Sequence, residues 1–193
     1  MPGGRRANVR LATLPLAFAA AEAAGGDWLT PAEQGRLAAM GSPTRRESFL
    51  AAHWSIRCLA ADVYGDTPGA WVLEASPTGA PRLLAPQGIP ARPWVSLSHC
   101  AGWVAVAMAP FPVGVDIERD WKPRDLHGLA DATFSPEERE QLRKLPEGER
   151  TAAFYLYWTL KEAQGKREGH GLRPELAIPP AYTDVWICTD PRG

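Results

Sequence analysis

A long helical stretch in the second half of the chain limits how the rest of it can fold. From Thr151 to Ala163 the residues favour a helix, and no proline interrupts them. Trp158, Glu162 and Lys166 are spaced four residues apart, so they share one broad face of this helix. A carboxylate and an ammonium group therefore lie one turn apart, beside a large aromatic ring. Taken alone, the pattern is typical of an exposed Glu–Lys pair on a surface helix.

A second stretch, residues 112–118, has the period-two alternation of a strand. Its apolar residues point one way, and Gly114, Asp116 and Glu118 point the other. Two carboxylates on one face of an apolar strand repel each other unless something neutralises them. A Mg²⁺ ion would do so, because it binds carboxylates together with waters and phosphates. Gly114 would let a ligand approach the backbone, and Glu162 could supply a third carboxylate.

Together, Gly114–Glu118 and Trp158–Lys166 resemble the signature pair of the 4′-phosphopantetheinyl transferases, in order and in spacing. The similarity is greatest to the larger, surfactin-synthetase-type branch and extends over residues 29–172. It implies an α+β fold of two similar lobes related by a pseudo-twofold, each with helices packed on a small antiparallel sheet. Coenzyme A would lie in the cleft between them. We expect residues 1–109 and 110–193 to form the two lobes of a monomer.

The chain also contains an internal repeat at an offset of 105 residues. Residues 30–33 (Thr-Pro-Ala-Glu) and 135–138 (Ser-Pro-Glu-Glu) both have the pattern of a helix start with a capping box. The same ungapped alignment matches three further pairs of identical residues: Leu37 with Leu142, Arg45 with Arg150, and Phe49 with Phe154. The repeat therefore supports two similar halves.

Basic residues of the first half are the candidates for the coenzyme A nucleotide. At the repeat offset Glu162 aligns with Arg57, so the first half has a basic helix where the second has an acidic one. As a group, Arg45, Arg46 and Arg57 suit phosphates, although each one fits a solvated surface equally well.

A predicted hairpin over residues 94–108 contains Ser98-His99, which resembles the family's Ser-His motif for the nucleotide of coenzyme A. Two positions depart from the family pattern and weaken expected phosphate contacts. Ala80 stands where lysine is common, although Arg82 could replace it, and His53 stands where arginine is common.

The resemblance implies that the protein transfers the 4′-phosphopantetheine group of coenzyme A to a serine of an apo carrier protein and releases 3′,5′-ADP. Asp116, Glu118 and Glu162 would hold Mg²⁺, or Mn²⁺, on the pyrophosphate. Lys166, together with Lys161, would add positive charge at the developing oxyanions. Glu162 is also the candidate general base, directly or through a metal-bound water, and the sequence leaves that choice open.

Several other functions are weighed against this one. A net charge of −1 without a basic face argues against nucleic-acid binding, and so against a Mg²⁺-dependent nuclease or phosphodiesterase. A degenerate relative that binds coenzyme A or a carrier without turnover stays open, because the chain ends soon after a predicted strand at residues 184–189. A Cys–His nucleophile at residues 99–100 is disfavoured, because neighbours on a strand point to opposite faces.

The ends and loops of the chain give weaker expectations. Arg5-Arg6 and the apolar run from Leu11 to Ala24 mimic a secretory signal, but Pro15 interrupts the run. We therefore expect a first strand over residues 9–16, followed by a loop. Three isolated cysteines favour a reducing cytoplasm, and no apolar stretch is long enough for a membrane span. Basic residues of the 119–131 loop, with Trp121, could dock a carrier, although a plain surface loop fits equally well: Arg119, Lys122 and Arg124.

Overall fold

The computed structural model describes residues 6–74, 81–118 and 125–175 of the 193-residue chain. Within these ranges the fold is α+β, as expected, with six α-helices, one short 3₁₀ helix and five strands. The elements, in chain order, are β1 (Asn8–Thr13), α1 (Leu14–Ala23), α2 (Pro31–Ala38), α3 (Pro43–Tyr64), the 3₁₀ helix (Pro68–Ala70), β2 (Val72–Glu74), β3 (Arg82–Leu84), β4 (Trp94–Cys100), β5 (Trp103–Ala109), α4 (Leu126–Thr133), α5 (Pro136–Lys144) and α6 (Glu147–Glu168).

The five strands form one antiparallel sheet in the order β1-β5-β4-β3-β2. The predicted hairpin is confirmed, with Trp94 opposite Ala109 and Cys100 opposite Trp103. Strand β5 is buried on both faces, which explains its nearly continuous apolar sequence. Its Val106 and Met108 pack in the cluster with α3, whereas Ala107 and Ala109 belong to a cluster on the other face.

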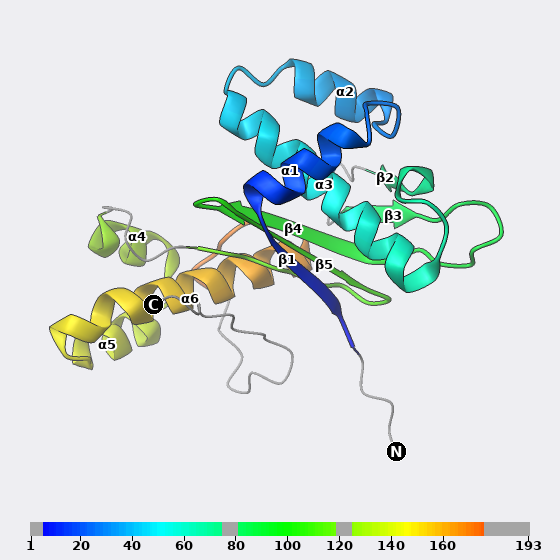
Figure 1. The fold of residues 1–193 in the computed structure, drawn as a ribbon. Coiled ribbons are helices and arrows are strands. Elements are labelled where there is room, and N and C mark those ends of the chain that lie inside the picture. The colour runs from blue at the N-terminus through cyan, green and yellow to red at the C-terminus, as the bar shows by residue number, and fades with distance from the viewer. Residues whose placement is uncertain (1–5, 75–80, 119–124, 176–193) are drawn as a thin grey trace.

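Helices α1 and α3 cover one face of the sheet, and α6 runs along the other side (Figure 1). The main core lies between α3 and the sheet and includes Ile56, Ala60, Trp71 and Leu83, all fully buried. Helices α4, α5 and α6 share a second cluster around Phe134, whose ring centroid lies 5.1 Å from that of Phe154. Residues 112–118, which carry two of the three predicted carboxylates, pack against β5 on one side and α6 on the other.

The N-terminal prediction was partly wrong. Strand β1 ends at Thr13, not at residue 16, and helix α1 follows where a loop was expected. Pro15 does not break this segment, because it occupies the first turn of α1, where its missing N–H leaves no hydrogen bond unmade. In the described residues no helix is both long and apolar enough to cross a membrane.

The predicted helix starts are confirmed. In α2 the Thr30 side chain accepts from the backbone N–H of Glu33, whose carboxylate accepts from the N–H of Thr30 in turn. Ser135 and Glu138 make the same capping box at α5. The predicted helix over Thr151–Ala163 is also present, as the central part of α6.

Each capping glutamate also forms a buried ion pair with the long helix that follows. Glu33 binds Arg57 on α3 (Oε2 to Nη2 2.7 Å), and Glu138 binds Lys161 on α6 (Oε2 to Nζ 2.8 Å). Both cations are fully buried. Arg57 and Lys161 thus pair with the two capping glutamates in the same way, and the two long helices are both 22 residues long. Helix α3 begins at Pro43 and helix α6 at Glu147, which is an offset of 104 residues rather than 105. By its position in the helix, Arg57 therefore corresponds to Lys161 and not to Glu162.

The buried cluster around Glu33 should make stability depend on pH. Burial alone would raise the pKa of Glu33, but hydrogen bonds from His53 and Arg57 lower it from 4.5 to about 2. Burial lowers the pKa of His53 below 6.5, so a neutral imidazole donates from Nδ1 to Glu33. Both groups bind fewer protons when folded. The stabilisation from both groups is therefore complete above pH 6.5. Below pH 6.5 it falls because the unfolded chain takes up a proton at His53, and below pH 4.5 it falls further because the unfolded chain takes up a proton at Glu33.

Urea unfolding of the wild type and of Glu33→Gln across this pH range checks the prediction. At neutral pH the variant should be less stable, because Arg57 loses its buried counter-ion. Towards pH 2 the difference in unfolding free energy should shrink by about 3 kcal/mol, since Glu33 becomes neutral in the wild type too. If the plots of unfolding free energy against pH stay parallel for the two proteins, the lowered pKa of Glu33 is contradicted.

Candidate active site

The carboxylate-bearing segment, residues 111–118, lies over the face of β4 instead of joining the sheet as a strand. The predicted strand is therefore wrong, but its alternation is right. Val113 and Val115 pack with Ala107 and Ala109 of β5, whereas Gly114 and Asp116 lie against α6. The backbone N–H groups of Val115 and Ile117 are bound by serine hydroxyls of β4, not by backbone carbonyls.

Gly114 allows the close approach of this segment to α6. A Cβ atom at this position would overlap the Ala163 carbonyl oxygen and lie 2.7 Å from the Ala163 carbonyl carbon and 2.9 Å from the Arg167 nitrogen. The space that we expected for a ligand is thus occupied by the helix backbone. This correction changes the role of Gly114: it brings α6, with its functional side chains, against the carboxylate segment.

Asp116 is the centre of the site. Its Oδ1 atom accepts from Lys166 Nζ at 2.7 Å and from Ser98 Oγ at 2.7 Å. Lys166 Nζ also donates to the carbonyl oxygen of Val115 at 3.2 Å. The Oδ2 atom of Asp116 is buried and makes no hydrogen bond within the described residues. One carboxylate oxygen is therefore fixed by the protein, and the other is available to a ligand.

Glu162 lies close enough to Asp116 and Glu118 for their charges to shift its pKa. Burial raises the pKa of Glu162, and the negative charges of Asp116 and Glu118 raise it further, against the opposing effect of Lys166. Glu118 accepts from Cys100 Sγ at 3.4 Å. The structure thus brings together the three carboxylates that the sequence singled out, with Lys166 beside them. In the described residues no group of three or more histidine, cysteine, aspartate or glutamate side chains is arranged to hold a metal ion, and Lys166 is the counter-ion of Asp116.

A group of basic side chains borders the carboxylates. His99 is exposed at the end of β4, and its pKa is lowered by partial burial and then by the charges of Lys166 and Arg45, with Asp116 acting in the opposite direction. Arg45 comes from the first turn of α3 and is exposed. Arg45, His99 and Lys166 therefore gather from three different elements at one place.

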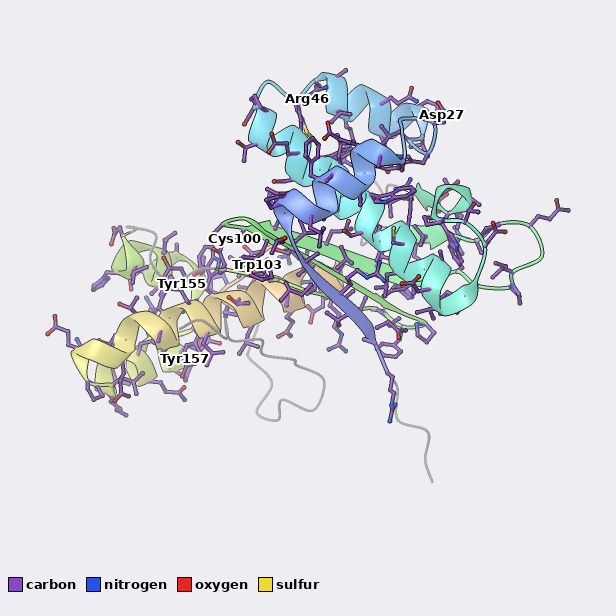
Figure 2. All side chains as sticks on the ribbon, in the orientation of Figure 1. Asp27, Arg46, Cys100, Trp103, Tyr155 and Tyr157 are labelled. Atoms are coloured by element: carbon purple, nitrogen blue, oxygen red, sulfur yellow. The ribbon has the colours of Figure 1, made fainter. Side chains whose placement is uncertain are left out.

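Three other basic residues predicted for coenzyme A do not join this group. Arg57 and Lys161 are enclosed in the ion pairs described above, and Lys161 also donates to the Pro174 carbonyl oxygen at 3.3 Å. Arg46 donates to the Leu37 carbonyl oxygen at 2.6 Å and so ties α3 to the end of α2. Figure 2 shows Arg46 in the helical layer above the sheet, whereas Cys100 and Trp103 lie at the β4–β5 turn. A phosphate contact for Arg57 or Lys161 is not supported, because neither side chain reaches the surface.

Other expectations need correction or fall outside the described residues. His53 is buried against Glu33, so its departure from the family pattern does not weaken a surface phosphate contact. Arg82 lies over the Trp94 ring at 4.0 Å and donates to the Arg92 carbonyl oxygen. The remaining expectations concern residues that lie outside the described ranges: Ala80, Arg119, Trp121, Lys122, Arg124 and the strand at residues 184–189.

The sequence did not single out Ser96 or Cys100, although both contact the carboxylate segment. The available signal was alternation: Ser96, Ser98 and Cys100 occupy every second position of β4 and so share one face. Small polar residues on the buried face of a strand need hydrogen-bond partners, and a polar segment had to lie opposite them.

Comparisons with known proteins agree with the geometry. Residues 112–188 match the model of the 4′-phosphopantetheinyl transferase superfamily. The chain is 31% identical over 146 residues to the 4′-phosphopantetheinyl transferase HetI of Nostoc sp.. This alignment covers 72% of this chain and 60% of the Nostoc protein. It is 30% identical over 158 residues to a 4′-phosphopantetheinyl transferase of Bacillus subtilis, covering 75% of this chain and 67% of the relative.

A shorter match gives higher identity. Over 77 residues the chain is 40% identical to the 4′-phosphopantetheinyl transferase psf-1 of Bacillus pumilus, covering 40% of this chain and 32% of the relative. The chain spans about 60% of the length of the Nostoc protein, so the match is to part of a longer relative. The family signature, the carboxylates that face α6 and these similarities lead to one conclusion: the chain belongs to the 4′-phosphopantetheinyl transferase superfamily.

Proposed function

We propose that this protein transfers the 4′-phosphopantetheine group of coenzyme A to a serine of an apo acyl or peptidyl carrier protein and releases 3′,5′-ADP. The observation that carries the proposal is the gathering of Asp116, Glu118 and Glu162 beside Lys166, from two segments 50 residues apart. Family membership gives this cluster its reaction class.

Mg²⁺, with Mn²⁺ as an alternative, is the cofactor that we propose for these residues. Asp116 Oδ2 is buried without a hydrogen-bond partner in the described residues, and such an oxygen is costly unless something binds it. Three carboxylates are hard oxygen donors of the kind that Mg²⁺ prefers. Asp116, Glu118 and Glu162 would hold the ion, which when bound would screen the charge of the pyrophosphate.

The side chains of the protein have separate tasks in this reaction. Glu162 would take the proton of the carrier serine, directly or through a water, while the serine oxygen forms its bond to the pantetheine-side phosphorus. The bond from that phosphorus to the bridging oxygen breaks, and 3′,5′-ADP leaves with the electron pair. Burial and the charge of Asp116 raise the pKa of Glu162 while no cation is bound, which favours its role as a base, and a bound Mg²⁺ would oppose that rise. Lys166 would place its ammonium charge against the phosphate oxygens as negative charge develops there.

Arg45 and His99 are the residues that we propose for the nucleotide phosphates. Both are exposed, and the charges of Arg45 and Lys166 lower the pKa of His99, which shows that the three side chains lie near one another. Arg46, Arg57 and Lys161 drop out of this set, because they bind groups within the protein. Lys161 would act on catalysis only by holding α5 against α6.

The two-lobe organisation, with boundaries at residues 1–109 and 110–193, also stays a proposal. Its support is the repeated unit of a capping box, a buried glutamate–cation pair and a 22-residue helix. A cleft between two internal lobes would suffice for one site, so we propose a monomer. We further propose a cytoplasmic protein with no nucleic-acid or membrane partner, in keeping with the free thiol at Cys58.

The mass of an apo acyl carrier protein after incubation with this protein, coenzyme A and Mg²⁺ tests the proposal. We expect a gain of one phosphopantetheine group, which is lost when a chelator is present and when the carrier serine is replaced by alanine. No gain across several carriers, from folded protein that still binds coenzyme A, would contradict it. That result would favour the alternative of a relative that binds coenzyme A or a carrier without turnover.

A further inference from the structure

Three alternate side chains of β4 hold the carboxylate segment by a regular set of hydrogen bonds. Ser96 Oγ accepts from the Val115 N–H at 3.0 Å, and Ser98 Oγ accepts from the Ile117 N–H at 3.3 Å. Ser98 Oγ also donates to Asp116 Oδ1 at 2.7 Å. One step further along, Cys100 Sγ donates to Glu118 Oε2 at 3.4 Å.

These contacts have a constant register. Each acceptor serine lies 19 residues before the N–H that it binds, and each donor lies 18 residues before its carboxylate. The segment therefore runs parallel to β4 and across its face. Strand β4 pairs along its whole length with β5 on one side, and Arg82 of β3 lies opposite Trp94 on the other. Side-chain oxygens thus take the place of the backbone carbonyls that an added strand would use.

The hydroxyl of Ser98 is already committed to this segment. A serine hydroxyl has one donor and two acceptor positions, and here the donor goes to Asp116 and one acceptor position to Ile117. Ser98 is buried, with 8% of its surface exposed. Its proton is therefore not available to a nucleotide phosphate while the bond to Asp116 exists. This differs from the role that the resemblance implies for the Ser-His motif, which His99 can still fill from its exposed position.

We propose that Ser98 is a positioning residue for the metal site: it holds Asp116 Oδ1 so that the buried Oδ2 faces the ion. This inference rests on the proposed function. Partners that orient a metal-binding carboxylate commonly change metal affinity or activity by about 10- to 100-fold when they are removed. Ser96 offers a matched comparison, because it is a buried serine on the same face whose hydroxyl, among the described residues, binds the segment's backbone and none of its carboxylates.

Binding of Mn²⁺ to the purified protein, measured by electron paramagnetic resonance, tests the role without turnover. Ser98→Ala should weaken Mn²⁺ binding by about 10-fold or more. The Mg²⁺ concentration for half-maximal transfer should rise in parallel, while KM for coenzyme A at saturating Mg²⁺ stays within about twofold. Ser98→Thr keeps the hydroxyl and should restore most of the affinity, and it also serves if the alanine variant does not fold.

The Ser96→Ala variant separates positioning from general loosening, and it should keep nearly the wild-type Mn²⁺ affinity. Equal losses in Ser96→Ala and Ser98→Ala would overturn the inference. So would a raised KM for coenzyme A with unchanged Mn²⁺ binding in Ser98→Ala, which would assign Ser98 to the nucleotide. A wild-type protein that binds Mn²⁺ but modifies no carrier would instead overturn the proposed activity, and the comparison of serine variants would still hold.

Discussion

Replacing Glu162 by glutamine should lower carrier modification by about 10²- to 10³-fold, the usual cost of removing one preorganised group that acts on the transition state. Glutamine has almost the same shape, so the packing of α6 is preserved. The change removes one of the three carboxylate charges that we propose to bind Mg²⁺. It also removes the group that we propose as the general base. Initial rates at saturating coenzyme A and Mg²⁺ measure the effect.

The same variant should be at least as stable as the wild type in the absence of metal. The pKa of Glu162 is raised by burial and by Asp116 and Glu118, which means that the folded protein disfavours its ionised form. A neutral glutamine removes that penalty. Loss of transfer with an unchanged or higher melting temperature would therefore assign Glu162 to function and not to folding.

An exposed glutamate on the same helix provides the control. Glu149 lies in the first turn of α6, away from the carboxylates, so Glu149→Gln should leave transfer unchanged. Near wild-type turnover by Glu162→Gln at saturating Mg²⁺ would contradict the proposed metal site. A fall in transfer that is equal in both variants would show that helix charge, and not the cluster, controls the rate.

Local patterns in the sequence predicted the elements whose causes are local. The helix starts at Thr30 and Ser135 are made within four residues, so their capping boxes could be predicted correctly. The central part of α6 and the β4–β5 hairpin follow from periodicity in the same way. Helix α1 was missed because Pro15 was taken as a break, although proline is well suited to the first turn of a helix.

The site was predicted in part, and the errors share one cause. The family signature links Asp116, Glu118, Glu162 and Lys166 across 50 residues, and in the structure Lys166 binds Asp116 while Asp116 and Glu118 act on the pKa of Glu162; the roles of these residues stay predictions. Arg57 was assigned to phosphate because a basic residue on an amphipathic helix has the same sequence pattern whether it meets a ligand or a buried glutamate. Its partner comes from α2, 24 residues away. Such tertiary pairings do not appear in periodicity.

Replacing Gly114 by alanine should destabilise the protein by about 3 kcal/mol, the upper end for an overpacked site. The added Cβ would meet backbone atoms of Ala163 and Arg167, and helix backbone cannot turn aside as a flexible side chain can. For a chain of this length the melting temperature should fall by about 6–12 °C. Gly35→Ala in α2 is the control, since its Cβ would meet nothing within 4 Å and a helix gains stability from the change.

The same substitution should also reduce transfer at temperatures where the variant is folded. Gly114 lies two residues before Asp116, and Ala163 adjoins Glu162 in sequence. If α6 must move away to admit a methyl group, Glu162 and Lys166 move away from Asp116 with it. We therefore expect weaker Mn²⁺ binding and slower transfer in Gly114→Ala, whereas Gly35→Ala should change neither. A folded Gly114→Ala protein with normal Mn²⁺ affinity and rate would contradict the view that this glycine sets the spacing of the site.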